Sequence, residues 1–160
     1  MPNDKMIKRM LATVLIAVFL LPSCAGDEIY SSEDFTEIVS QSYSPSLGVA
    51  EVGEFYKTVY FNNVEELLQI KVYKSLESSN FDEIGVLEFV DSKSAKSALG
   101  MVEEYLKKAN ETFKKGIVYN AEEYVKFQGS KVERFGNILV YTILEKRSSD
   151  EIFAKIKRGV

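Results

Sequence analysis

The 160-residue chain contains no histidine and no tryptophan, and it has a single cysteine, Cys24. The absence of histidine excludes a Ser-His-Asp triad, a Cys-His dyad and imidazole ligands for zinc. One cysteine excludes an internal disulfide and a thiolate cluster. Because 24 acidic residues outnumber 20 Lys and Arg, the chain also lacks the basic surface of a nucleic-acid binder. We therefore expect a non-enzymatic protein with no cofactor, no metal site and no nucleic-acid partner.

The chain also lacks an apolar run long enough to span a membrane. Its longest run, residues 10–21, would form a helix about 18 Å long, against roughly 30 Å for the hydrocarbon core. Lys5, Lys8 and Arg9 precede this run. A short positive segment followed by 7–15 apolar residues is typical of a secretory signal peptide. The N-terminal segment is therefore predicted to be a signal peptide and not a spanning anchor.

The end of this segment, Leu21-Pro22-Ser23-Cys24, resembles the lipobox of bacterial lipoproteins. The resemblance implies a signal peptide over residues 1–23 and a diacylglyceryl group on the Cys24 thiol, with cleavage before this residue. The implied location is the extracytoplasmic face of the cell membrane, because two acyl chains anchor a protein stably. The alternative is simple secretion with cleavage after Ala25, since Ser23 and Ala25 are both small.

The rest of the chain predicts a short tether, residues 24–29, and one domain over residues 30–160. Apolar periodicity predicts helices over 32–42 and 52–60, a long helix between the cap residue Asp91 and Gly116, and a helical turn over 120–127. Alternating or continuous apolar patterns predict the remaining elements: strands over 68–73 and 84–90, a hairpin of 131–135 and 138–144 around Gly136-Asn137, and a last helix opened by the capping box Ser148-x-x-Glu151.

This order of elements is typical of an α+β fold. We expect about four strands in an antiparallel or mixed sheet, with the helices mainly on one face. The run over residues 84–90 is apolar almost throughout, which predicts a central strand.

Residues 30–158 also resemble a family of small clostridial-type surface lipoproteins. The resemblance lies in the segment 82–84 with the long helix after it, in Tyr119, in Glu123-Tyr124 and in residues 136–140. These proteins carry the domain of unknown function numbered 4358. The resemblance implies a lipid-anchored extracytoplasmic domain, and it supplies no activity, cofactor or catalytic residue.

Adjacent carboxylates are the only groups in the sequence that suggest catalysis. They occur at Glu65-Glu66, Asp82-Glu83, Glu103-Glu104 and Glu122-Glu123. Two carboxylates in different environments catalyse glycoside hydrolysis, so a cell-wall polysaccharide hydrolase is the alternative function. Solvated surface charge is the commoner explanation, because neighbouring helical residues do not converge on one substrate. An acid pair in a pocket with a raised pKa would favour the enzyme.

Four aromatic residues between positions 55 and 61 are the candidate partner contact: Phe55, Tyr56, Tyr60 and Phe61. Neighbouring residues of a helix point about 100° apart, so a narrow buried face cannot take all four rings. We expect at least one ring to be accessible for a protein or cell-wall partner, and we expect Tyr60→Ser and Phe61→Ser to leave the melting temperature nearly unchanged. The alternative is ordinary core packing. The favoured function is a lipid-anchored binding or assembly module.

Overall fold

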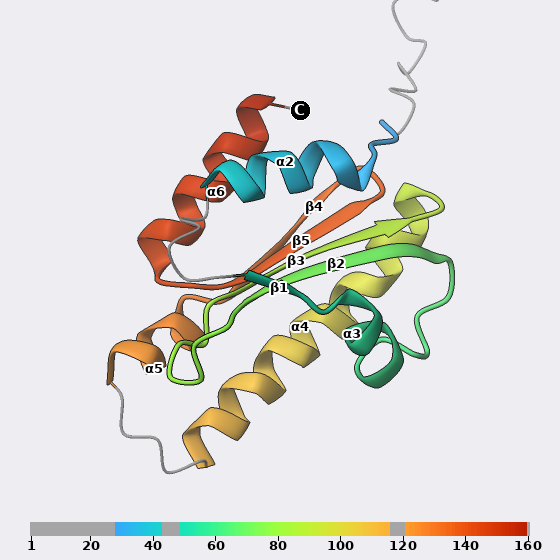
Figure 1. Ribbon diagram of the computed structural model, residues 1–160. Coiled ribbons are helices and arrows are strands. Elements are labelled where there is room, and N and C mark those ends of the chain that lie inside the picture. The colour runs from blue at the N-terminus through green and yellow to red at the C-terminus, as the bar shows by residue number, and fades with distance from the viewer. Residues whose placement is uncertain (1–27, 43–48, 116–120, 160) are drawn as a thin grey trace, which may run out of the picture.

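The computed structural model describes residues 28–42, 49–115 and 121–159. The described strands form one antiparallel sheet in the order β1-β2-β3-β5-β4 (Figure 1). The elements in chain order are α2 (Ser32–Ser42), β1 (Val49–Glu51), α3 (Gly53–Val59), β2 (Leu67–Ser75), β3 (Glu83–Phe89), α4 (Ser92–Lys115), α5 (Ala121–Gln128), β4 (Lys131–Phe135), β5 (Ile138–Ile143) and α6 (Lys146–Gly159).

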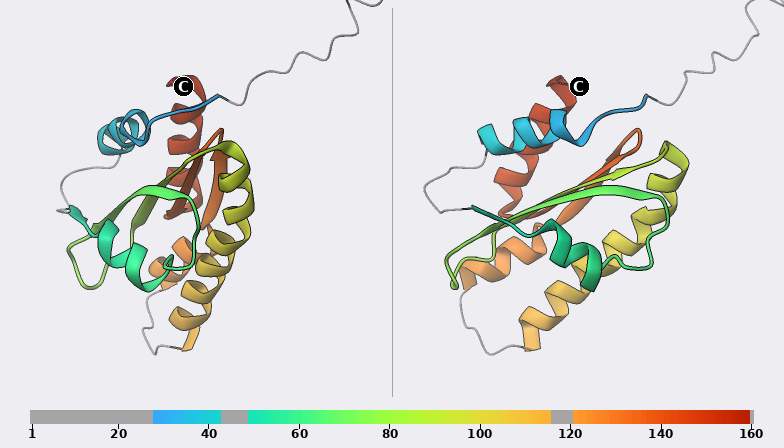
Figure 2. Two further views of the ribbon diagram at one scale, coloured as in Figure 1. Left: turned by 90° about the vertical axis from the view of Figure 1, so that its right-hand side faces the viewer. Right: turned by 45° about the vertical axis from the view of Figure 1, so that its right-hand side comes forward.

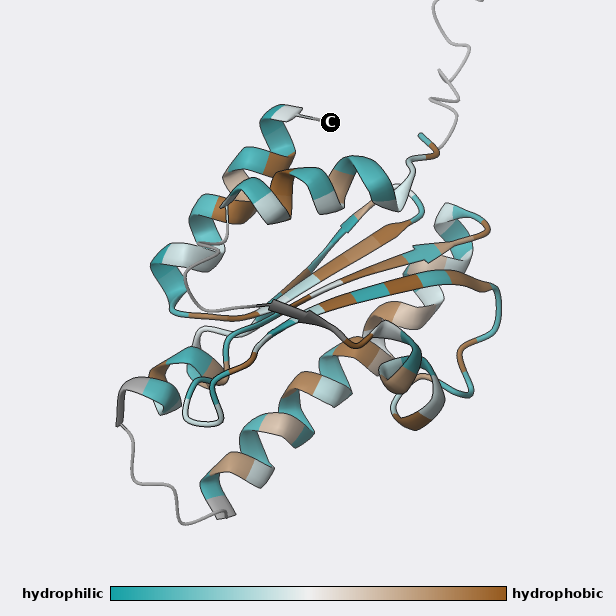
Figure 3. Cartoon of the chain, viewed as in Figure 1, coloured by the Kyte–Doolittle hydropathy of each residue, from teal (hydrophilic) through white to brown (hydrophobic). Residues whose placement is uncertain are grey.

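Helices cover both faces of this sheet, with α2 and α6 on one side and α3, α4 and α5 on the other (Figure 2). Each face has its own buried cluster. Successive residues of β3 supply them alternately, since Val86 packs with α2 and α6 whereas Leu87 packs with α3 and α4. The hydropathy colours agree, because β5 is hydrophobic while α6 has a largely hydrophilic outer surface (Figure 3).

The α+β class and the antiparallel sheet are confirmed. The sheet has four longer strands and a fifth, the three-residue β1, at one edge. The expectation of helices mainly on one face is wrong. All six residues of β5 and six of the seven in β3 are buried, so both sides of these strands need an apolar cover.

Local signals placed most elements correctly. The Asp91 carboxylate caps α4 by accepting a hydrogen bond from the Ser94 N–H at 2.7 Å. The two-residue turn of the β4–β5 hairpin is also confirmed, and Gly136 there has φ +50°. The capping box at Ser148 is wrong, because α6 begins at Lys146 and Ser148 lies inside its first turn.

The first described residues, Glu28 to Tyr30, lie beside this hairpin turn. The side-chain oxygen of buried Asn137 accepts from the Tyr30 N–H at 2.7 Å. Its amide group donates to the carbonyls of Tyr30 and Phe89, at 3.0 and 3.1 Å. A Cβ on Gly136 would lie 2.1 Å from the Glu28 carbonyl oxygen, so the glycine permits this close approach. The N-terminal end of the domain is thereby held at one end of the sheet.

Cys24 and residues 1–23 lie outside the described residues, as does Tyr119. Among the helices of the described ranges, none is both long and apolar enough to cross a membrane.

Candidate ligand-binding cavity

Three tyrosine hydroxyls converge on one buried carboxylate, that of Glu83 at the start of β3. Glu83 is 3% exposed. Its Oε1 accepts hydrogen bonds from the hydroxyls of Tyr105 on α4, at 2.6 Å, and Tyr141 on β5, at 2.9 Å. Its Oε2 accepts a hydrogen bond from the Tyr56 hydroxyl on α3. The carboxylate therefore joins two helices to the centre of the sheet.

Two glycines make this convergence possible. Gly85 is the cross-strand partner of Tyr141, and a Cβ at position 85 would lie 2.0 Å from Cε1 of that ring. The ring therefore lies flat over β3, where its hydroxyl reaches Glu83. A Cβ on Gly53 would lie 2.2 Å from the carbonyl oxygen of Ile70, so the glycine lets α3 begin close against β2. This close packing positions Tyr56 over the sheet.

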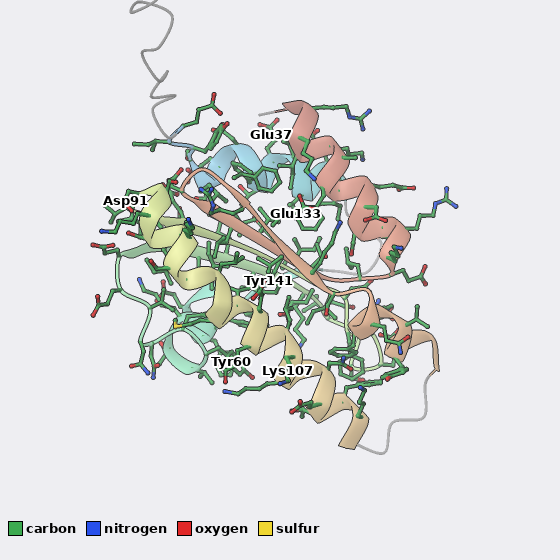
Figure 4. The ribbon with its side chains drawn as sticks, turned by 180° about the vertical axis from the view of Figure 1, so that it is seen from behind. Glu37, Tyr60, Asp91, Lys107, Glu133 and Tyr141 are labelled. Carbon is green, nitrogen blue, oxygen red and sulfur yellow. The ribbon has the colours of Figure 1, made fainter. Side chains whose placement is uncertain are left out.

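The rings also contact one another, with Tyr105 at the centre. Its centroid lies 6.0 Å from that of Tyr56, 5.5 Å from that of Tyr141 and 5.1 Å from that of Tyr60. Viewed from behind, Tyr141 lies between the sheet and α4, and Tyr60 lies beside the same helix (Figure 4). Edge-to-face and tilted contacts of this kind add to the stabilisation from burial.

The environment keeps the three hydroxyls protonated. Burial raises the pKa of Tyr56, Tyr105 and Tyr141 above the ordinary value, and the negative charge of Glu83 raises each pKa further. The phenolic protons therefore stay on the tyrosines, where they are shared with the Glu83 carboxylate.

A cavity of about 560 Å³ opens beside this cluster, between α3, α4, α5 and the adjoining ends of β2, β3 and β5. This volume lies within the range of small-molecule sites. The lining is mainly aromatic and aliphatic, with polar groups among it: Tyr56, Val59, Tyr60, Asn62, Asn63, Lys74, Phe81, Glu83, Met101, Glu104, Tyr105, Lys108, Ala109, Thr112, Phe113, Phe127 and Ile143.

Two cavity lysines differ in their partners. Lys108 pairs with Glu104 at 2.7 Å, and both side chains are largely exposed. Half-buried Lys74 lies directly opposite Glu83 in the β2–β3 register. Among the side chains that the structure describes, Lys74 forms no ion pair. The cavity thus holds one ammonium group without a carboxylate partner.

A second buried charge cluster lies next to the cavity and fixes one wall. The Lys126 ammonium on α5 lies 2.7 Å from carboxylate oxygens of both Asp82 and Glu123, and it donates to the Asn80 side-chain oxygen at 3.0 Å. Burial lowers the pKa of Lys126, but the bonds to the two carboxylates outweigh burial and raise it overall. Glu123 also accepts from the Phe81 N–H at 2.8 Å. This cluster holds α5 against the β2–β3 connection.

The acid pairs of the sequence separate in the structure. Asp82 binds Lys126 whereas Glu83 binds the tyrosines, and among the acidic side chains that the structure describes, Glu83 and Glu104 line the cavity. A glycosidase needs one acid kept protonated near neutral pH. The hydrogen bond from Lys108 lowers the pKa of Glu104, which is the opposite of that requirement. Within the described ranges, no three acidic, His or Cys side chains form a metal-binding group.

The four candidate contact rings divide into two pairs. Phe55 and Tyr60 are 57% and 49% exposed, so the expectation of an accessible ring is confirmed. Tyr56 and Phe61 are 4% and 2% exposed and belong to the core. The expectation that Phe61→Ser leaves stability unchanged is therefore wrong, because the ring packs against Tyr105. Contact of a partner with Phe55 and Tyr60 stays a prediction.

Sequence reasoning named Glu83 only as one member of an acid pair, and it did not single out Tyr105, Tyr141 or Lys74 as residues of the candidate site. A charged residue at the start of an apolar strand was the one available signal, since such a side chain needs polar partners when it is buried. Comparison with protein-family models, curated proteins and solved structures found no match to this chain.

Proposed function

We propose that this chain is a lipid-anchored, extracytoplasmic binding module whose ligand occupies the cavity beside Glu83. The cavity itself carries the proposal, because it combines aromatic walls with a few convergent polar groups, as binding sites for small molecules do. The resemblance of residues 30–158 to small surface lipoproteins supports the same location.

The geometry of the domain is consistent with an anchor at Cys24. Tyr30, which is held at the β4–β5 turn, is the sixth residue after Cys24, so the domain would stay within about 20 Å of the membrane. Phe89 lies at this end of β3, and Glu83 lies six residues away, about 20 Å along the strand. An anchored domain would therefore carry the cavity at the end of its sheet away from the anchor.

Lipidation is tested by Cys24→Ala. No other thiol exists in the chain, so this variant should incorporate no labelled fatty acid and should leave the membrane fraction or keep its signal peptide. The measurement is metabolic labelling, fractionation and mass spectrometry of the N-terminus, with wild type processed in parallel. Unlabelled wild-type protein that begins at Gly26 would refute the anchor.

The ligand site is tested by nuclear magnetic resonance of the full chain in detergent against free amino acids, monosaccharides and nucleosides. A compound that binds should shift resonances of Tyr60, Tyr105 and Phe113. Thr112→Trp narrows the cavity from an exposed wall position and should abolish the shifts. The control Glu111→Trp, on the same helix but outside the cavity lining, should not. Shifts that survive Thr112→Trp would refute this site.

A further inference from the structure

The part of the cavity lining formed by Glu83, Tyr56 and Tyr105, here called the floor, offers acceptors of hydrogen bonds and no donors. Tyr56 and Tyr105 line the cavity, and each uses its hydroxyl hydrogen to donate a hydrogen bond to Glu83. Their oxygens therefore present only lone pairs to a ligand. A carboxylate has about four lone-pair positions, and Glu83 uses two on Oε1 and one on Oε2. One acceptor position on Oε2 is left over.

Glu83 also has no cation within ion-pair distance among the described residues. Its partners in the described part of the chain are neutral hydroxyls, and it takes part in no ion pair there. Buried charges in proteins are normally paired, because removing an ion from water is costly. A group with several N–H donors and a positive charge fits this floor, and a primary ammonium has three donors and no acceptor. The aromatic faces around it also attract a cation.

Lys74 supplies the complementary charge from the neighbouring strand β2, on the same face of the sheet as Glu83. Cβ atoms of directly opposed residues lie about 5 Å apart, so Lys74 and Glu83 are neighbours in the cavity. The remaining two charges of the lining, Lys108 and Glu104, already neutralise each other. A ligand with an ammonium group alone would leave the Lys74 charge uncompensated.

On the basis of the proposed ligand site, we infer that the ligand is a small zwitterion, a free α-amino acid with an apolar side chain. Its ammonium group binds the acceptors formed by Glu83, Tyr56 and Tyr105, and its carboxylate binds Lys74. The side chain packs against three mutually contacting rings, Phe81, Phe113 and Phe127, which also line the cavity. The inference extends the proposed function by giving the ligand its chemical class.

Isothermal titration calorimetry of the full chain in detergent at neutral pH tests this inference with three probes that share one ring. Phenylalanine carries both charges, phenethylamine lacks the carboxylate, and hydrocinnamate lacks the ammonium group. Charge-assisted hydrogen bonds contribute enough that each missing charge should weaken binding by about tenfold or more. Hydrocinnamate binding as tightly as phenylalanine would overturn the inference.

Lys74→Met keeps the aliphatic stem and removes the charge. It should reduce phenylalanine affinity to that of phenethylamine and should leave phenethylamine binding unchanged. Lys71→Met is the matched control, because Lys71 lies on the same strand and pairs with Glu33 of α2 on the other face of the sheet. Glu83→Gln should remove binding of both amines, with folding checked by circular dichroism. Unchanged phenylalanine binding in Lys74→Met would overturn the inference even if Glu83→Gln fails to fold.

The outcomes separate the ligand class from the site. In one outcome, no amino acid binds, but a monosaccharide or nucleoside shifts cavity resonances and Thr112→Trp abolishes those shifts. The inference that the ligand is a zwitterion is then wrong, and the proposed function stands. If no compound of the three classes shifts cavity resonances, both proposals fail.

Discussion

The absence of a Cβ atom at two glycines determines how side chains and backbone pack at the centre of this protein. Gly85 leaves the space that the Tyr141 ring occupies, and Gly53 lets α3 approach the backbone of β2. Neither glycine has a positive φ. Among the described glycines, Gly136 is the one with a positive φ. Close packing, not backbone conformation, therefore explains the residue type at positions 53 and 85.

Gly85→Ala should destabilise the protein by about 1–3 kcal/mol or more, because the added methyl group overlaps the Tyr141 ring. Gly100→Ala is the matched control. It lies within α4 with nothing within 4 Å of the added Cβ, so it should stabilise by about 0.5–1 kcal/mol. Urea denaturation gives both values. Equal and small effects would mean that the ring does not lie over β3.

Helix α3 and the turn that follows it each have one side buried against the domain and one side exposed to solvent. The seven-residue α3 buries Tyr56 against Glu83 and exposes Phe55, and the following turn exposes Tyr60 and buries Phe61. Helices this short are marginal on their own, so α3 depends on these buried rings for its position. One wall of the cavity depends on them in turn.

Phe61→Ala should cost about 3–5 kcal/mol of unfolding free energy, as expected for a large buried ring. Phe55→Ala, at an exposed position of the same segment, should change stability by no more than about 0.5 kcal/mol. Thermal melts of both variants test this difference. If Phe55→Ala proves as costly as Phe61→Ala, the orientation of α3 is wrong.

The whole molecule should be sensitive to alkali. A tyrosine is neutral when protonated, and in an unfolded chain it ionises near pH 10. Because burial and Glu83 raise the pKa of Tyr56, Tyr105 and Tyr141, unfolding releases protons above that pH. The contribution to stability is therefore complete below about pH 10 and declines as pH rises beyond it. Lys126, whose pKa is also raised, acts in the same direction.

The free energy of unfolding should fall above pH 10 by up to about 1.4 kcal/mol per pH unit for each such group. Phenolate absorbance should show that three of the nine tyrosines ionise only as the chain unfolds, which circular dichroism follows in parallel. Tyr141→Phe should reduce the number of delayed tyrosines by one. Simultaneous ionisation of all tyrosines before unfolding would contradict the buried cluster.

Local sequence patterns were enough to predict the α+β class, the long helix after Asp91 and the hairpin around Gly136-Asn137. Each depends on residues close together in the chain, namely an apolar period, a cap or a turn. The start of α6 was missed, because Ser148-x-x-Glu151 has the residue types of a capping box although Ser148 lies inside the first turn of the helix.

The Glu83 cluster, the strand register and the placement of helices on both faces depend on packing between segments that are distant in the sequence. The partners of Glu83 lie 22, 27 and 58 residues away along the chain, so no local pattern joins them. Strand register places Lys74 opposite Glu83 and Gly85 beneath Tyr141, and the helices on both faces follow from strands that are apolar on both sides. Periodicity reports which face of an element is apolar, but the side chains that meet across a sheet depend on register and on the packing of distant segments.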